Sequence, residues 1–451
     1  MKRAAAALLF FAACATRPPA LTLSDCKAGD LPARCGTLVR SESPRSPRTL
    51  SMPVIVVPAA VHNDSAIVVL AGGPGDTVLE GAPRTQQFFP KLHERHDFVF
   101  IDQRGTGKSA PLQCPQATAK YQRAFLEGPL FPDGYARDCS AELAAHADLA
   151  AYTYPYFIDD VEALRVALGY GPLNLMGLSY GTRAAQTYLQ RYPHSIRSLV
   201  LLGPVAPDTR TPLHFSHDAQ LALDRLVDAC ARDAACHAAF PSFDAELHTV
   251  FTTTSSIDAG ALGEWLRTKL YSTESAATVP LLIHKAAAGD WQPLAADFAR
   301  YRAEWYTSIP LYLAVTCPSD TRHIDPNDVA VATAGSLFGD YRVRRQLAAC
   351  AEWTPGFVEP QVEVPRDGGV PALLLSGDAD PVTPAAWGDV VAKRIGSSAR
   401  VVVLPNTAHG DISPCLFDLM TRFIDEPNPA GLDTSCMNGL QRPAFTVKGP
   451  M

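Results

Sequence analysis

The sequence lacks the features of several common functional classes. Its 46 Asp and Glu residues outnumber its 39 Lys and Arg residues, giving a formal net charge of −7, so no basic surface for nucleic acid is expected. No Cys-x-x-Cys spacing or His/Cys cluster indicates a metal site. The segment Gly105-x-Gly107-Lys108-Ser109 resembles the end of a phosphate-binding loop, but Asp102 stands where that loop requires glycine, and the third glycine of a dinucleotide fingerprint is missing. We therefore expect no nucleotide, metal or other cofactor.

The N-terminus carries a short apolar segment. Lys2 and Arg3 precede the apolar stretch 4–13, which is far too short to span a bilayer and is typical of a removable export signal over residues 1–15. Two processing sites compete. The sequence before Cys14 resembles a bacterial lipoprotein box with Phe11 where Leu is more usual, whereas Ala13-Cys14-Ala15 fits an A-x-A cleavage site. We expect a periplasmic, cell-envelope or extracellular protein, attached to a membrane only through a lipid on Cys14.

The cysteine count fits an exported protein. Setting Cys14 aside leaves ten of the 11 cysteines, an even number, and structural disulfides are the default in an oxidising compartment. Connectivity does not follow from sequence alone, but loop-closure entropy favours short-range pairs. These would be Cys26 with Cys35, Cys114 with Cys139, Cys230 with Cys236, Cys317 with Cys350, and Cys415 with Cys436.

Strands and helices alternate through two parts of the chain. Apolar, β-branched runs that end in turn residues predict strands, and apolar residues at helical spacing predict the helices between them. This alternation is typical of a mostly parallel sheet with helices on both faces. Strands are expected at residues 54–57, 66–70, 98–101, 173–176, 196–202, 372–375 and 401–404, and helices at 157–168, 180–192, 385–395 and 416–424.

Between these parts the pattern becomes alanine-rich and helical. Candidate helices span residues 221–231, 260–270, 281–288 and 294–301. We interpret residues 206–367 as a large helical lid inserted into a sheet domain formed by residues 16–205 and 368–451.

Gly177-Leu178-Ser179-Tyr180-Gly181 lies between a predicted strand and a predicted helix. In that context the pentapeptide forms a sharp turn that exposes Ser179 as a nucleophile. A serine hydroxyl needs a base within hydrogen-bond reach and an acid that orients the base. His409 follows one later strand, and Asp378 and Asp380 both follow another. The order Ser, Asp, His at strand ends is what an α/β-hydrolase sheet requires, and spacing alone does not separate the two aspartates.

Two loops complete the predicted site. Gly72-Gly73-Pro74-Gly75 follows the strand at 66–70, and the N–H groups of Gly73 and Tyr180 are the candidate oxyanion donors. After the strand at 98–101, Asp102 and Arg104 are expected to fix their loop beneath the site by charge-assisted hydrogen bonds.

Taken together, these motifs resemble the secreted tripeptidyl aminopeptidases and related prolyl aminopeptidases, over roughly residues 30 to 440. They are Gly72-Gly73-Pro74-Gly75, Asp102-Gln103-Arg104-Gly105-Thr106-Gly107-x-Ser109, Gly177-x-Ser179-Tyr180-Gly181, Asp380-Pro381-Val382-Thr383-Pro384 and Ala408-His409-Gly410. The resemblance implies that Asp380 rather than Asp378 is the triad acid. One departure is Ala71, where many prolyl aminopeptidases carry histidine, and this weakens a strictly proline-releasing reading.

The resemblance also implies an exopeptidase that acts on peptides with a free N-terminus and releases tripeptides or N-terminal residues. Lid carboxylates would then bind the substrate ammonium group. The sequence does not name them; Glu264, Glu274, Asp297, Glu304 and Asp320 are the candidates. A carboxylesterase using the same triad, and a noncatalytic binding scaffold, are the competing hypotheses.

Overall fold

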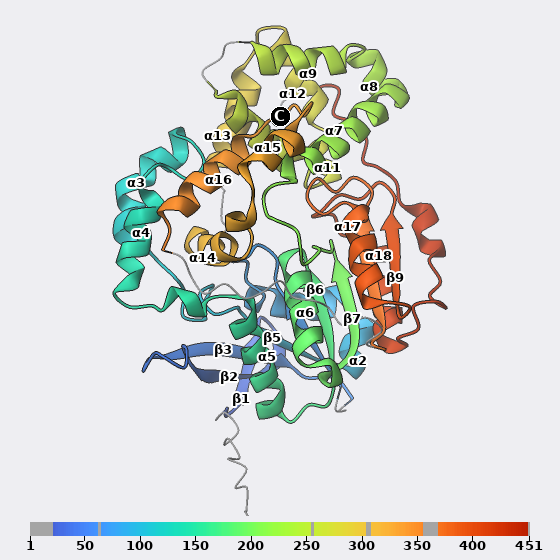
Figure 1. Ribbon diagram of the computed structural model, residues 1–451. Helices are drawn as coiled ribbons and strands as arrows, with labels where there is room; N and C mark the ends of the chain where they lie inside the picture. Colours follow the sequence, from blue (N-terminus) through green and yellow to red (C-terminus); the bar gives the residue numbers. More distant parts are fainter. Residues whose placement is uncertain (1–20, 62–64, 254–256, 304–307, 355–368, 450–451) are drawn as a thin grey trace, which may run out of the picture.

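The computed structural model describes residues 21–61, 65–253, 257–303, 308–354 and 369–449, so the predicted export signal and Cys14 lie outside the described residues. A nine-stranded sheet forms the centre, in the order β1-β2-β3-β5-β4-β6-β7-β8-β9. Figure 1 shows helices on both sides of this sheet and a helical region above the carboxyl ends of its strands.

The larger part of the sheet is parallel. It comprises β4 (Ala66–Leu70), β5 (Asp97–Ile101), β6 (Leu173–Leu178), β7 (Ile196–Leu202), β8 (Ala372–Gly377) and β9 (Ala399–Leu404). Every pairing among these strands is parallel. The central strands are buried on both faces, which explains their near-continuous runs of valine, leucine and isoleucine. The expected fold class, a mostly parallel sheet with helices on both faces, is confirmed.

Helices cover the two faces with separate apolar cores. One core joins the sheet to α5 (Tyr154–Leu168), α6 (Tyr180–Arg191) and α17 (Ala385–Ile395). The opposite core joins it to α2 (Pro90–Arg95) and α18 (Pro414–Asp425). All strand and helix positions expected in this part of the chain are present, with ends that shift by a few residues.

Three strands at the N-terminal edge depart from the parallel pattern. They are β1 (Ser24–Ala28), β2 (Leu31–Ser41) and β3 (Thr49–Val57), and they pair antiparallel with one another and with β5. The sequence indicated only the last residues of β3. In β2 only Ala33 and Leu38 are buried hydrophobic residues, so this strand lacks the apolar alternation that would have revealed it.

The inserted helical region between β7 and β8 has its own apolar core around the buried side chain of Trp265. Its helices are α7 (Phe215–Arg232), α8 (Ala234–Ala239), α9 (Phe243–Thr252), α10 (Ala259–Lys269), α11 (Thr273–Ala276), α12 (Val279–Ala287), α13 (Gln292–Ala303), α14 (Ile309–Ser319), α15 (Pro326–Thr333) and α16 (Tyr341–Glu352). Each of the four helices expected here overlaps one of these.

A second chain segment joins this helical region. Helices α3 (Pro115–Glu127) and α4 (Tyr135–Ala144) contact α13, α14 and α16 and lie beside them in Figure 1. The C-terminal tail also ends on the region, where Phe445 packs into its core and the Thr446 N–H donates to the Ala277 carbonyl oxygen at 3.1 Å. The helical region above the sheet is therefore formed by α3, α4 and the C-terminal tail in addition to the segment 206–367.

Five disulfides connect the described cysteines. They join Cys26 to Cys35, Cys114 to Cys139, Cys230 to Cys236, Cys317 to Cys350, and Cys415 to Cys436. All five pairings expected from loop closure are confirmed.

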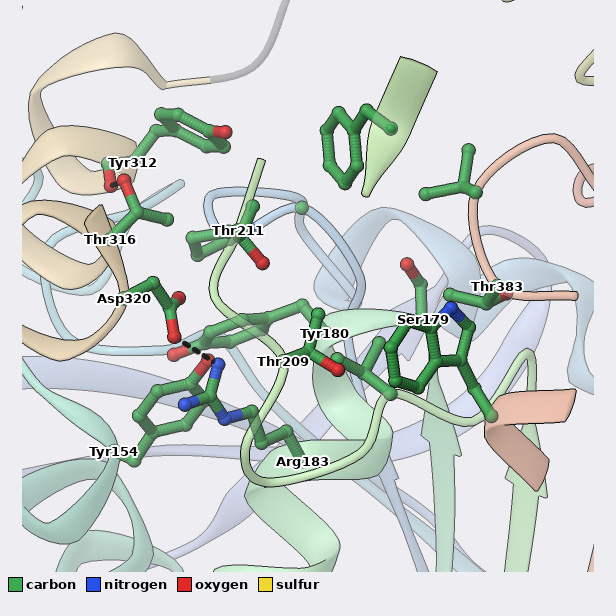
Figure 2. A pocket seen from close by; sticks show the side chains of 16 residues that line it. Tyr154, Ser179, Tyr180, Arg183, Thr209, Thr211, Tyr312, Thr316, Asp320 and Thr383 are labelled. Carbon is green, nitrogen blue, oxygen red and sulfur yellow. Dashed lines mark hydrogen bonds and ion pairs between the residues drawn. The ribbon is translucent and has the colours of Figure 1, made fainter. Parts of the chain in front are cut away.

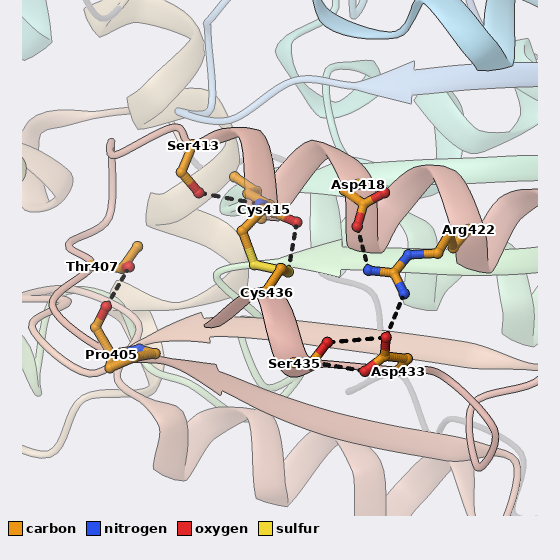
Figure 3. Close-up of a disulfide and its surroundings, with 10 residues drawn as sticks. Pro405, Thr407, Ser413, Cys415, Asp418, Arg422, Asp433, Ser435 and Cys436 are labelled. Carbon is orange, nitrogen blue, oxygen red and sulfur yellow. Dashed lines mark hydrogen bonds and ion pairs between the residues drawn. A yellow bond between two sulfur atoms is a disulfide. The ribbon is translucent and has the colours of Figure 1, made fainter. Parts of the chain in front are cut away.

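The last disulfide fixes the C-terminal segment on α18. Figure 3 shows Cys415, in the first turn of α18, bonded to Cys436 in a short 3₁₀ helix (Ser435–Gly439). Arg422 on α18 also pairs with Asp433 at 3.2 Å, and Ser413 Oγ caps the helix by accepting from the Leu416 N–H. This anchors the helix that follows the loop of His409.

None of the helices in the described ranges is both long and apolar enough to cross a membrane.

Candidate active site

Ser179 lies at a strained turn between β6 and α6. Its backbone has φ 51° and ψ −117°, and φ values above zero are rare for residues with a side chain. The flanking glycines are required by close packing: a Cβ on Gly181 would stand 2.1 Å from the Leu70 carbonyl oxygen, and one on Gly177 would stand 2.6 Å from the Gly181 oxygen. The Ser179 N–H donates to the Leu202 carbonyl oxygen at 2.8 Å, which ties the turn to β7.

Asp380 and His409 come together from the loops after β8 and β9. His409 Nδ1 lies 2.8 Å from Asp380 Oδ2; the Asp380 side chain is buried, and 12% of the His409 side chain remains exposed. Asp380 Oδ1 accepts the N–H groups of Val382 and Thr383, each at 2.8 Å. The hydroxyl of Thr383 donates to Asp380 Oδ2 at 2.7 Å and lies 3.1 Å from His409 Nδ1. The carboxylate is thereby held in one orientation toward the imidazole.

The two groups shift each other's titration in opposite directions. Burial alone would raise the pKa of Asp380, but the charge and hydrogen bond of His409 outweigh it and lower that pKa. Burial would lower the pKa of His409, but Asp380 outweighs it and raises that pKa. The pair thus favours an imidazolium next to a carboxylate, the state that a general base reaches after it has accepted a proton.

Asp378, the other aspartate that spacing allowed, has different partners. Its carboxylate lies 3.4 Å from the Thr407 N–H nitrogen and 3.8 Å from Arg225. These contacts hold its own loop. Of the two aspartates, the structure brings only Asp380 into hydrogen-bond contact with His409.

Ser179 and His409 lie at the same site without a direct hydrogen bond between them in this structure. Thr383 contacts His409 and also lines the cavity that Ser179 borders. A Cβ on Gly203 would stand 2.8 Å from Thr383 Oγ1 and 3.1 Å from His409 Cε1, so a side chain at position 203 is excluded. Catalytic hydrogen bonds are often long in unliganded sites and shorten when substrate binds.

The cavity beside Ser179 is lined by aromatic, hydroxyl and charged side chains (Figure 2). Gly73, Pro74 and Tyr180 border it together with Ser179, which puts both candidate oxyanion residues next to the nucleophile. The Tyr180 N–H is at the start of α6, where the first N–H groups have no acceptor within the helix. The remaining lining residues are Tyr154, Arg183, Val205, Thr209, Thr211, Phe215, Tyr312, Thr316, Asp320, Val382, Thr383 and Trp387.

A buried ion pair closes the far end of this cavity. Arg183, one turn into α6, donates to Asp320 at 2.5 Å, and both side chains are largely shielded from solvent. Arg183 also donates to the Pro207 carbonyl oxygen at 3.0 Å. Since Asp320 follows α14, the pair connects the helix that starts at the nucleophile to the inserted helical region.

The five lid carboxylates considered from sequence have different environments. Asp320 lines the cavity of Ser179. Glu264 is buried between Arg267 and Arg342, and Asp297 is bonded to Trp265, Lys269 and Arg300. Glu274 is exposed in the first turn of α11, and Glu304 lies outside the described residues. Only Asp320 of the four described lines that cavity.

Removing one partner of the Arg183–Asp320 pair should strongly destabilise the fold. We expect Asp320→Asn to lower the free energy of unfolding by about 3–5 kcal/mol, because the Arg183 guanidinium would remain buried without a counter-charge. Chemical denaturation with the disulfides intact measures this. The double variant Arg183→Met, Asp320→Leu should recover most of the loss, and Arg123→Ala in an exposed ion pair should leave the midpoint unchanged. Equal midpoints for Asp320→Asn and the parent protein would contradict the structural role of the pair.

The inserted region also holds the loop of His409. The Gly410 N–H donates to the Tyr271 carbonyl oxygen at 2.7 Å, and the Asp411 carboxylate accepts the Thr273 N–H at 3.1 Å. The ring of Tyr271 meets the His409 ring edge-on, with centroids 5.3 Å apart. None of these contacts had a sequence signal, because they join residues far apart in the chain.

The loop after β5 is fixed by two separate sets of bonds. Arg104 forms a buried two-point ion pair with Asp160 on α5, with both distances 2.7 Å. Asp102 accepts the N–H groups of Val78 and Leu79 at 2.7 and 3.2 Å, which fastens the chain that follows the Gly72–Gly75 loop. The described residues contain no group of three or more His, Cys, Asp or Glu that could hold a metal ion.

Several known proteins are similar to this chain. A sequence model of the family described as "alpha/beta hydrolase fold" matches residues 65–413. The serine protease Hip1 of Mycobacterium tuberculosis is 25% identical over 434 residues, covering 83% of this chain and 81% of that protein. The tripeptidyl aminopeptidase of Streptomyces lividans is 24% identical, covering 83% and 77%. The crystal structure of a proline iminopeptidase from Mycobacterium smegmatis aligns with a TM-score of 0.42 and 17% identity, covering 87% of this chain and 98% of that one.

Proposed function

This chain belongs to the α/β-hydrolase family, and from that premise we propose that it is an exported serine aminopeptidase that cleaves peptides near a free N-terminus through an acyl-enzyme on Ser179. The observation that most directly supports the serine chemistry is the 2.8 Å contact of Asp380 with His409, on the loops after β8 and β9 of the sheet in which β6 leads to the Ser179 turn. The coarser conclusion, a serine hydrolase of this family, rests on the family match over most of the chain.

The proposed reaction begins when the Ser179 hydroxyl attacks the scissile carbonyl carbon and gives its proton to His409 Nε2. The carbonyl oxygen takes up negative charge and accepts hydrogen bonds from the Gly73 and Tyr180 N–H groups, a contribution of roughly 3–4 kcal/mol per donor. His409 then protonates the leaving nitrogen, the C–N bond breaks and the amine departs. Water attacks the resulting ester, His409 takes the water proton, and the proton returns to Ser179 as the acid product leaves.

Asp380 orients His409 and stabilises the imidazolium that forms twice in this cycle. Its second oxygen is held by two backbone N–H groups. A carboxylate fixed in this way keeps the Nδ1 proton facing it and leaves Nε2 free to act as the base.

We propose that a free N-terminus is recognised by a lid formed by residues 206–367, which α3, α4 and the C-terminal tail pack against. Of the lid carboxylates considered, Asp320 lines the Ser179 cavity; because Arg183 already pairs with it at 2.5 Å, a substrate ammonium group would share this carboxylate with Arg183. The nearby Thr209 hydroxyl is buried without a hydrogen-bond partner among the described residues, and such groups are usually satisfied by a ligand or water. Peptidases such as Hip1 and the tripeptidyl aminopeptidase, similar over most of the chain, add support for peptide substrates.

An oxidising compartment is consistent with five disulfides. We keep the proposal of an export signal over residues 1–15, with a lipid on Cys14 as one of its two processing outcomes. Mass spectrometry of the mature N-terminus distinguishes them.

A panel of aminoacyl and tripeptidyl anilides, each with a free or an acetylated amine, tests the peptidase proposal. We expect kcat/KM to fall at least tenfold on acetylation, since a buried polar site rejects a ligand that cannot pair with it. The panel also reports how many residues are released. The alternative is a carboxylesterase on the same triad, because fold and triad do not set the substrate. Equal rates for free and acetylated amines, with faster cleavage of simple esters, would favour that alternative.

A further inference from the structure

Asp76 is a carboxylate at the active site that the mechanism above does not use. It directly follows the Gly72–Gly75 loop, and a Cβ placed on Gly72 would stand 3.0 Å from Asp76 Oδ2 and 3.5 Å from Ser179 Cβ. The side chains of Asp76 and Ser179 therefore both lie next to Gly72. Asp76 remains accessible to solvent, as a residue that contacts substrate must be.

The Asp76 carboxylate has no protein partner that would explain it. Asp102, Asp160, Asp320 and Asp380 each accept hydrogen bonds or form ion pairs. Among the described residues, none forms a hydrogen bond or ion pair with the Asp76 side chain. Crowding by neighbouring atoms raises the pKa of Asp76, although the charge of His409 acts in the opposite direction. The Asp76 carboxylate is therefore available to pair with a cationic group of a bound substrate.

Asp76 lies outside the cavity that borders Ser179. It is absent from the residues that line the cavity of Figure 2, which holds Tyr180, Arg183 and Asp320. Asp76 and His409 are close enough for each charge to affect the other's pKa. The leaving nitrogen must lie beside His409, because this residue protonates it. A residue that follows the scissile bond and passes His409 would therefore come near Asp76.

From this placement we infer that Asp76 forms a subsite for a positively charged group on the leaving side of the scissile bond, so that the enzyme prefers lysine or arginine directly after the bond it cleaves. This inference deepens the proposed function and rests on its assignment of Ser179 and His409. An ion pair between an accessible carboxylate and an ammonium group contributes little free energy, because water screens the two charges. We therefore expect a preference of roughly twofold to fivefold in kcat/KM for the cationic leaving group.

Two substrates that differ only in the leaving group test the subsite. Both carry the acyl part that is best in the anilide panel; one releases neutral 4-methylaniline and the other releases 4-(aminomethyl)aniline, whose ammonium group is charged at neutral pH. The ammonium substituent also withdraws electrons and makes its aniline a better leaving group, so the ratio of the two kcat/KM values is compared between proteins. It should be roughly twofold to fivefold lower in Asp76→Asn than in the parent protein, and lower still in Asp76→Lys.

Glu80→Gln is the matched control, because it removes the same charge from an exposed position four residues along the chain. It should leave the ratio at the parent value. Labelling of Ser179 by a neutral fluorophosphonate should proceed at similar rates in all four proteins, which shows that the site is intact. A ratio that Asp76→Asn does not change would overturn the subsite. So would a Glu80→Gln ratio that falls as far as that of Asp76→Asn.

The pH profile supplies a second readout. Asp380 and Asp76 raise the pKa of His409, while Arg267 on α10 lowers it; Thr383 and the Tyr271 ring are its other neighbours. Removing the negative charge at position 76 makes the imidazolium less favourable, so the acid limb of kcat/KM for the neutral substrate should move to lower pH in Asp76→Asn. An acid limb that stays in place would contradict the closeness of Asp76 to His409 and overturn the inference.

The subsite and the peptidase proposal fail in different ways. If no anilide is cleaved, the same comparison is made with 4-methylphenyl and 4-(aminomethyl)phenyl esters, whose leaving groups pass the same residues. A charge preference that depends on Asp76 in the esters alone would support the subsite while rejecting the aminopeptidase.

Discussion

Replacing Ser179 with alanine should reduce kcat on the order of a million-fold and abolish labelling by a fluorophosphonate. Without the hydroxyl no acyl-enzyme can form, and the remaining groups act only by binding substrate and polarising its carbonyl. Mass spectrometry of the labelled parent protein should find the adduct on the peptide that contains Ser179. Circular dichroism and the denaturation midpoint should change little, because the side chain has lost only one partly exposed oxygen.

Ser179→Gly is the companion variant that separates chemistry from backbone strain. The turn has φ 51°, which glycine adopts without the steric cost that alanine retains. Both variants should be equally inactive, but the glycine protein should be more stable than the alanine protein by about 1 kcal/mol. An alanine variant that still forms the fluorophosphonate adduct would show that another residue is the nucleophile.

The sequence was informative wherever local chemistry determines structure. The turn around Ser179 could be predicted because Gly177 and Gly181 are needed where a Cβ would collide with backbone oxygens. The disulfides followed from cysteine count and loop length, since each pair closes a short segment. The buried strands were visible because both of their faces require apolar residues.

Contacts between distant segments had no comparable signal. Helix α3 buries almost none of its side chains, with Ala117 as its buried residue. Its sequence therefore has no apolar stripe that could predict its packing against the inserted region. The Arg183–Asp320 pair joins residues 137 positions apart, and opposite charges are too common in a chain for such a pairing to be deduced. Asp76 had no sequence signal for a related reason: the subsite that we infer there depends on its place beside Ser179 and not on any motif.

The choice between Asp378 and Asp380 shows the limit most clearly. Both follow β8 within three residues of its end, and either could have reached a histidine on the next loop. The choice is made by backbone N–H groups at 382 and 383, which turn one carboxylate toward His409. Such a turn depends on torsion angles that sequence spacing does not encode.

Asp380→Asn should therefore lower kcat/KM on the order of 10⁴-fold, the cost of converting a triad acid to its amide. Asparagine can keep the bonds from the N–H groups of Val382 and Thr383 through its carbonyl oxygen, which leaves the amide NH₂ facing His409 Nδ1. The imidazole must then accept at Nδ1 and carry its proton on Nε2, so it can no longer take the Ser179 proton. Because Asp380 raises the pKa of His409, the remaining activity should also show an acid limb at lower pH.

Asp378→Asn is the matched control for that loss. Its carboxylate lies 3.8 Å from Arg225 and 3.4 Å from the Thr407 N–H nitrogen and makes no hydrogen bond to His409, so an amide should change kcat/KM by no more than roughly a factor of two. Steady-state kinetics on one anilide, with both variants checked for folding by denaturation, makes the comparison. If the two variants lost activity equally, the orientation of His409 would depend on the whole loop rather than on one carboxylate. A large loss in Asp378→Asn alone would assign the acid to that residue and require the loop to rearrange when substrate binds.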